Sequence, residues 1–95
     1  MFKELDPVLH SPLRLAVMSI LIGVKEAEFS YLKEKTNATA GNLSVQISKL
    51  VEAEYITMAK SFRDNYPLTT CKITSKGVKA FAEYVDSIKT YISKK

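Results

Sequence analysis

The sequence TAGNLSVQISKLVEA at residues 39–53 has the pattern of a helix with two unlike faces. Four aliphatic side chains recur at helical spacing and predict a face packed against a core: Leu43, Ile47, Leu50 and Val51. The opposite face carries small, uncharged polar residues and one lysine, whereas an ordinary solvated helix usually carries Glu and Lys. Because Asn and Gln amides match the adenine edge in the major groove, this face predicts a helix that reads DNA.

Individual contacts can be assigned to this helix and to the residues before it. We expect Asn42 and Gln46 to reach base edges, and the side chains beside them are Ser44, Val45 and Ser48. Phosphate contacts are expected from Lys49 and from the hydroxyls of Thr39, Ser30 and Tyr31. Gly41 would let a phosphate approach the backbone, although a frayed helix start would explain a glycine equally well. The alternative for Asn42 and Gln46 is simple solvation.

Length and composition bound the class of protein. Ninety-five residues make one domain that buries about 60 to 68% of its unfolded surface, so association of subunits would help its stability. One Cys and one His predict no internal disulfide, no metal site and no cofactor. No apolar run approaches the roughly 18 residues of a membrane span, and the start MFKELDPV is unlike a secretory signal, which predicts a cytoplasmic protein without membrane contact. The sequence offers no nucleophile with its base and no carboxylate pair that would converge in a pocket, so it does not predict an enzyme.

The charge is concentrated in the second half of the chain. Residues 1–55 carry six Lys and Arg against seven Asp and Glu, whereas residues 56–95 carry eight against three. Five of these cations fall within twenty residues that contain one acid: Lys60, Arg63, Lys72, Lys76 and Lys79. Such a basic segment is suited to binding the phosphates of a nucleic acid, and the alternative is a surface that only keeps the protein in solution.

The first half of the chain predicts a helix-turn-helix at about residues 30–54. The expected segments are a helix at 12–24, a turn at 25–28, a helix at 30–35 in which Leu32 and Tyr31 pack, and the helix from Thr39. Ser11 before Pro12 is a helix-start signal, and Ser30 is expected to cap the second helix. Asn37 tolerates the left-handed conformation that ends helices.

A β-hairpin is predicted directly after this unit, at about residues 55–74. Its expected parts are a strand at 55–62, a turn at 63–67 and a strand at 68–74, because β-branched and aromatic residues flank the turn cluster RDNYP. A short strand near Phe29 would pair with the hairpin. Cys71 is expected to be buried in the second strand, and His10 is expected to pack or to be solvated.

The last predicted helix covers about residues 75–93 and is capped by Thr74, with Ile73 and Val78 as a hydrophobic staple. Its apolar residues follow the spacing of a coiled-coil seam, widened on one flank: Val78, Phe81, Tyr84, Val85, Ile88, Tyr91 and Ile92. The stripe is about 20 Å long, which favours a partner helix from a second subunit over packing on the protein's own first helix alone.

Three segments resemble the winged-helix transcriptional regulators related to the MarR and ArsR families. They are LDPVLHSPLRLAVMSIL at residues 5–21, the helix start TAGNLS at 39–44, and a wing pattern formed by Lys60, Phe62, Arg63, Pro67, Thr69, Ile73, Thr74 and Gly77. The resemblance implies an α+β, mainly α, winged helix-turn-helix. It implies a homodimer whose third helix enters the major groove while Lys60, Arg63 and Asn65 of the wing meet the backbone or minor groove. The wing departs from the pattern at Tyr66 and Leu68, which replace basic residues.

The expected function is therefore sequence-specific binding of double-stranded DNA by a homodimeric transcriptional regulator, with residues 1–95 as one domain. Two alternatives stay open: a winged-helix module that binds another protein, and a non-specific, chromatin-like DNA-binding protein. Relatives of this fold often bind small-molecule effectors, and the sequence identifies no such site.

Overall fold

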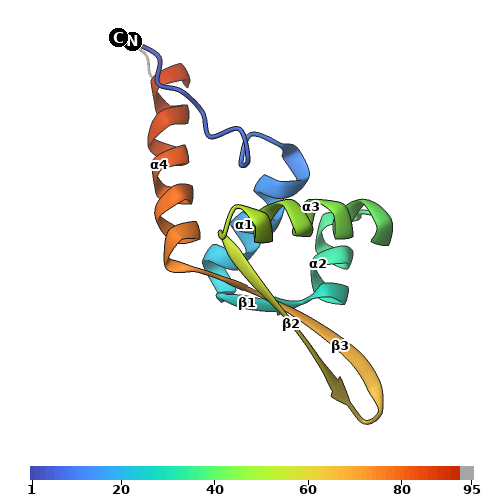
Figure 1. Ribbon diagram of the computed structural model, residues 1–95. Helices are drawn as coiled ribbons and strands as arrows, with labels where there is room; N and C mark the ends of the chain where they lie inside the picture. The colour runs from blue at the N-terminus through green and yellow to red at the C-terminus, as the bar shows by residue number, and fades with distance from the viewer. Residues whose placement is uncertain (93–95) are drawn as a thin grey trace.

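The computed structural model, which describes residues 1–92, joins a cluster of three helices to a projecting β-hairpin and a C-terminal helix (Figure 1). In chain order the elements are α1 (Pro12–Val24), β1 (Glu26–Glu28), α2 (Phe29–Thr36), α3 (Ala40–Glu52), β2 (Ile56–Arg63), β3 (Tyr66–Ile73) and α4 (Ser75–Ile92). This order is a winged helix-turn-helix and confirms the predicted fold class. The predicted end of the last helix at residue 93 lies outside the described residues.

The core draws on nearly every element. Its buried apolar residues are Leu9, Val17, Met18, Leu21, Leu32, Leu43, Ile47, Leu50, Ile56, Cys71, Ala80 and Tyr84. Each large aliphatic side chain buried in this way contributes about 1.5–3 kcal/mol of transfer free energy. Cys71 is buried as predicted, and its burial raises the pKa of the thiol. Tyr31, by contrast, was expected to pack and is 41% exposed, because its neighbour Leu32 takes the inward position on α2.

Several local signals act as the sequence predicts. Asn37 ends α2 in the left-handed conformation with φ 58°. Thr39 caps α3 by accepting a hydrogen bond from the Asn42 backbone N–H at 3.2 Å. Thr74 caps α4, since its hydroxyl oxygen lies 2.9 Å from the Gly77 N–H. Each contact satisfies a donor that a helix start would otherwise leave without a partner.

The segment between α1 and α2 differs from the prediction. Residues 26–28 form β1 instead of a turn, because they pair with β3 in the antiparallel register Glu26↔Lys72 and Glu28↔Thr70. The strand lies just before Phe29 and pairs with β3, which confirms the predicted short strand near Phe29 that pairs with the hairpin. It carries the chain directly into α2, whose N-cap is Glu28 and not Ser30. Strand pairing therefore displaces the predicted cap by two residues.

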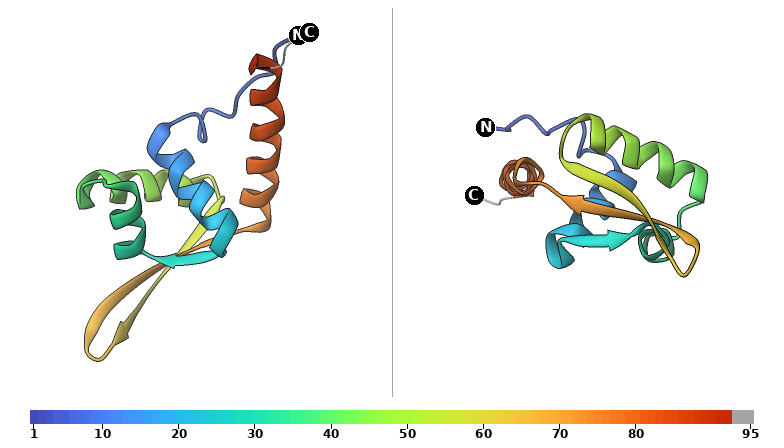
Figure 2. Two further views of the ribbon diagram at one scale, coloured as in Figure 1. Left: turned by 180° about the vertical axis from the view of Figure 1, so that it is seen from behind. Right: turned by 60° about the horizontal axis from the view of Figure 1, so that its bottom comes forward.

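The hairpin of β2 and β3, residues 56–73, is called the wing below. Its turn is confined to Asp64 and Asn65, with φ of 50° and 69°, so the strands extend further than the predicted turn at 63–67 allowed. Two consecutive positive φ values give a tight turn whose twist matches the flanking strands. In the sheet order β1-β3-β2, the wing continues past β1 and away from the helices (Figures 1 and 2).

A close backbone approach fixes the start of α4. A Cβ at Gly77 would overlap the Tyr55 carbonyl oxygen and lie 3.0 Å from Ile73 Cγ1. The same carbonyl accepts the Thr74 N–H at 3.0 Å. Only glycine fits at this position, and α4 therefore diverges from the wing at a defined point (Figure 2).

Candidate nucleic-acid interface

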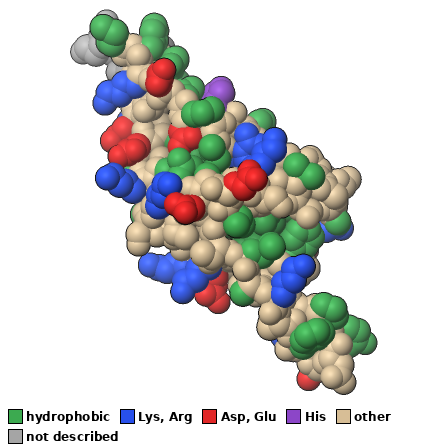
Figure 3. Space-filling model, in the orientation of Figure 1, with side chains coloured by type: hydrophobic (Ala, Val, Ile, Leu, Met, Phe, Trp, Pro, Cys, Tyr) green, Lys and Arg blue, Asp and Glu red, His purple; other side chains and the backbone are tan. Residues whose placement is uncertain are grey.

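The exposed face of α3 is small and largely uncharged. Leu43, Ile47 and Leu50 are buried, so the opposite side of the helix faces solvent. The predicted DNA contacts Gly41, Asn42, Ser44, Val45, Ser48 and Lys49 are all exposed there. Val45 is 51% exposed and could meet a thymine methyl group. In Figure 3 the surface over α3 consists mainly of uncharged side chains and backbone.

Gln46 is more constrained than its neighbours on α3. It is half-buried, and its amide nitrogen donates to Asn42 Oδ1 at 3.0 Å. Its amide oxygen accepts a hydrogen bond from the Arg14 guanidinium, which also donates from Nε to the Val8 carbonyl at 2.6 Å. The oxygen of Gln46 is therefore occupied within the protein, and Asn42 is the amide placed further out toward solvent.

Arg14 is a residue that sequence reasoning missed. It is the one charged side chain of α1, PLRLAVMSILIGV, and this isolation in an apolar helix was the available signal. The structure places its guanidinium against the middle of α3, where it donates a hydrogen bond to Gln46. An open hollow beside it is lined by Arg14 and Lys49 together with Glu52.

The three hydroxyls expected to contact phosphate differ in whether they already make a hydrogen bond within the protein. Ser30 and Tyr31 are exposed on α2, and the Lys35 ammonium lies 5.6 Å from the centre of the Tyr31 ring. The Thr39 hydroxyl already accepts the cap hydrogen bond of α3, although its proton remains free to be donated.

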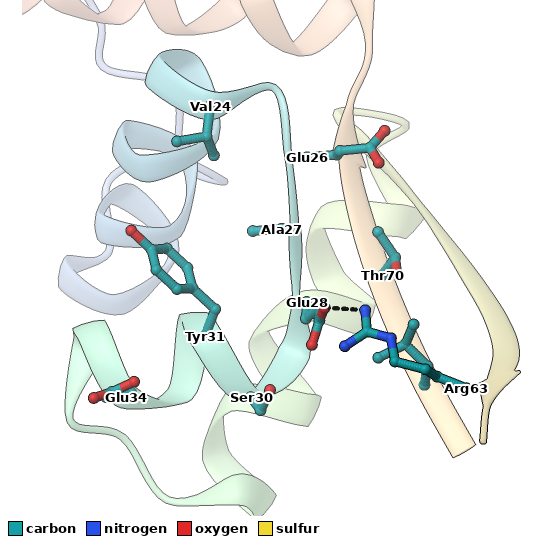
Figure 4. Close-up of a pocket in the computed structure, with 10 residues that line it drawn as sticks. Val24, Glu26, Ala27, Glu28, Ser30, Tyr31, Glu34, Arg63 and Thr70 are labelled. Atoms are coloured by element: carbon teal, nitrogen blue, oxygen red, sulfur yellow. Dashed lines mark hydrogen bonds and ion pairs between the residues drawn. The ribbon is translucent and has the colours of Figure 1, made fainter. Parts of the chain in front are cut away.

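Arg63 is held by a carboxylate of the same chain. Its Nη2 lies 2.6 Å from Glu28 Oε2, in an ion pair across the rim of an open hollow between α2, β1 and the wing (Figure 4). The hollow is also lined by Glu26 and Glu34. The three carboxylates Glu26, Glu28 and Glu34 repel an anionic ligand from this hollow.

The cations of the second half of the chain do not form a single patch. Lys60 is exposed on the wing, near Arg63 but on the other face of the hairpin. Lys72 stands opposite Glu26 in the sheet register, and Lys76 lies 3.3 Å from Glu54. Their density in the sequence therefore overstates the positive charge of any one surface.

The predicted dimerisation stripe of α4 is divided between two faces. Phe81, Tyr84 and Ile88 pack on the protomer's own core, and the Tyr84 hydroxyl lies 3.0 Å from His10 Nδ1. This corrects the assignment of Tyr84 to a subunit interface, because the N-terminal segment brings His10 over it. The outer stripe, Val78, Val85 and Ile92, lies outside this core, and Val78 and Ile92 are 46% and 69% exposed.

The end of α4 is joined to the start of the chain. Tyr91 stacks on Phe2 with ring centroids 4.9 Å apart and donates its hydroxyl to the Lys3 carbonyl at 2.8 Å. Both aromatic side chains remain largely exposed. This stacked pair adds exposed aromatic surface at the C-terminal end of α4.

Among residues 1–92, no group of three or more His, Cys, Asp or Glu side chains is placed to hold a metal ion. No helix in this part of the chain is long and apolar enough to cross a membrane.

Comparison with known proteins agrees with this geometry. The family model of the winged helix DNA-binding domain matches residues 13–92. The chain belongs to this family. It is 38% identical over 81 residues to an uncharacterized protein of Methanocaldococcus jannaschii, covering 85% of this chain and 88% of that protein.

Solved structures extend the comparison. A transcriptional regulator homologue from Pyrococcus horikoshii has a TM-score of 0.84 and 29% identity, over 90% of this chain and 84% of that one. A ZitR variant of Lactococcus lactis, solved in complex with DNA, has a TM-score of 0.65 and 17% identity, over 96% of this chain and 62% of that one. The second likeness is one of fold. The structural neighbours are transcriptional regulators resembling the MarR family.

Proposed function

We propose that this winged-helix protein is a transcriptional regulator that binds specific duplex DNA as a homodimer. The observation that carries the proposal is the exposed face of α3, which is uncharged except for Lys49 and presents Asn42 and Val45 to solvent next to a projecting wing (Figure 3). Polar and apolar side chains of this size contact base edges, and the single lysine adds phosphate attraction. The likeness to the Pyrococcus horikoshii regulator homologue supports the assignment to transcription.

The homodimer is supported by the outer stripe of α4. Val78, Val85 and Ile92 are spaced by seven residues, so they lie along one side of the helix, outside the core. A second copy of the protein could pack against this stripe across a twofold axis. The same axis would relate the two α3 helices. Their half-sites would then lie about 34–36 Å apart, or a multiple of that distance.

Fluorescence anisotropy tests the proposal directly. The protein is titrated into a duplex from the region upstream of its own gene and into a random duplex, each at two salt concentrations. Salt-sensitive binding that favours the upstream duplex supports a specific regulator. Equal, salt-sensitive binding to both supports a chromatin-like protein, and no binding to these or to a selected pool of random duplexes would favour a protein-interaction module.

Two substitutions separate base contacts from phosphate contacts. Asn42→Ala should reduce sequence preference by about 1–3 kcal/mol at one position, because it removes an amide available to a base. Lys49→Ala should weaken binding to every sequence and lower the salt slope by about 1. Equal losses on both duplexes from Asn42→Ala would contradict its role in base recognition.

A further inference from the structure

The tip of the wing is apolar on both of its faces. Phe62 and Tyr66 are 76% and 75% exposed, and Pro67 is also exposed. In the hairpin register Phe62 is opposite Pro67, and Tyr66 is opposite Arg63, so the two aromatic rings leave opposite faces of the ribbon. These three residues, Phe62, Tyr66 and Pro67, are called the tip cluster. Figure 3 shows hydrophobic side chains gathered at this end of the molecule.

The backbone holds the tip cluster away from the domain. The last wing pair beside β1 is Ala59↔Thr70, since Thr70 also pairs with Glu28. Four further residue pairs follow before the turn, which carries the tip about 13 Å beyond β1. The tight turn at Asp64 and Asn65 keeps the end only two strands wide. Exposed aromatic residues on such a projection mark a contact surface.

The charges around the tip cluster select its partner. Near the tip the wing carries two cations, Lys60 and Arg63, of which Arg63 is paired with Glu28, and one acid, Asp64. Lys60 and Arg63 lie within two residues of Phe62 and on opposite faces of the ribbon. A partner with flat apolar faces between two rows of negative charge fits this arrangement. Stacked base pairs between the phosphates of a minor groove have that chemistry.

We propose that the tip cluster is an apolar wedge, in which Phe62 enters the minor groove beside the major groove occupied by α3 and partly unstacks a base step. The proposal deepens the function proposed above and depends on it. In Figure 3 the tip and the uncharged surface over α3 face the same side of the molecule, so one duplex could meet both. Wedges of this kind kink DNA by about 20–90°, which would make deformable steps part of the recognised sequence.

The absence of tryptophan from the chain allows a direct test. Phe62→Trp places a single fluorophore in the tip cluster, and Phe2→Trp places a matched one at the opposite end of the molecule (Figure 1). Both parent side chains are exposed, at 76% and 68%. Each variant is titrated with the upstream duplex and with a random duplex, while anisotropy of the labelled DNA reports binding independently.

We expect DNA to quench the emission of Trp at position 62 and to leave that at position 2 unchanged. Phe62→Ala should weaken binding about 5- to 150-fold while keeping its melting temperature, because the side chain packs on nothing in the core. Energy transfer between the duplex ends should show bending by the wild type and less bending by Phe62→Ala.

Three outcomes would overturn the wedge. If anisotropy shows binding but the emission at position 62 does not change, the tip lies outside the groove and the proposed function still stands. If the wild type binds neither these duplexes nor a selected pool of random ones, the proposed function fails and the wedge fails with it. If the emission at position 62 changes with protein concentration in the absence of DNA, the tip cluster is a contact between copies of the protein.

Discussion

Replacing Glu28 by Gln should strengthen DNA binding, although no expected DNA contact is altered. Glu28 holds Arg63 at 2.6 Å, and the two side chains are 36% and 62% exposed. An ion pair this exposed is worth roughly 0.2–1 kcal/mol. If Arg63 must leave Glu28 to reach a phosphate, Glu28→Gln should tighten binding by about 1.4- to 5-fold. Loss of repulsion between Glu28 and phosphate acts in the same direction.

Removal of Arg63 and a control carboxylate separate the release of Arg63 from the loss of repulsion by Glu28. Arg63→Gln should lower the slope of log affinity against log salt by about 0.9, which changes the affinity ratio between 50 and 200 mM salt by about 3.5-fold. Glu34→Gln is the matched control, because Glu34 lines the same hollow on the side away from Arg63 (Figure 4). Anisotropy titrations of Glu28→Gln, of Arg63→Gln and of the variant that carries both substitutions complete the double-mutant cycle. Equal tightening by Glu34→Gln, or tightening by Glu28→Gln that persists in the Arg63→Gln background, would refute the competition for Arg63.

Four further changes have defined outcomes. Gly77→Ala should lower the free energy of unfolding by about 1–3 kcal/mol in urea titration, because its Cβ would overlap the Tyr55 carbonyl; an unchanged midpoint would contradict this packing. A Cβ at Gly41 would meet no atom within 4 Å, so Gly41→Ala should raise the free energy of unfolding slightly, by at most about 1 kcal/mol. The same substitution should weaken DNA binding if a phosphate approaches this backbone. Burial and a hydrogen bond to Asp6 raise the pKa of Tyr55 to about 12 from an ordinary 10, so wild-type stability should fall as pH rises from 10 to 12, and by less in Tyr55→Phe. Val85→Glu should produce monomers in equilibrium sedimentation, since it places a charge within the outer stripe; a variant that remains dimeric would exclude this interface.

Local signals were sufficient for the existence of the four helices and the hairpin and for the order of elements. Capping at Thr39 and Thr74, the left-handed Asn37 and the spacing of Leu43, Ile47 and Leu50 depend on residues within one or two turns of the chain. Such signals can be read without knowing what lies across the core. The resemblance to winged-helix regulators could be recognised for the same reason, because its motifs are short segments in a fixed order.

The remaining features depend on partners distant in sequence. Glu28 became a strand residue and a cap because β3 lies beside it, and it then met Arg63 from the end of β2. Arg14 reached Gln46 across 32 residues, which left Asn42 as the more available amide of α3.

The apolar stripe on α4 shows most clearly that sequence pattern alone cannot assign the partner of each residue. Its period identified apolar positions, but a period does not say which neighbour covers each one. Packing of the N-terminal segment and α1 assigned Tyr84 and Ile88 to the protomer's core and left Val78, Val85 and Ile92 outside it. Helix periodicity is a property of the chain itself, whereas burial is a property of the surfaces that folding brings together.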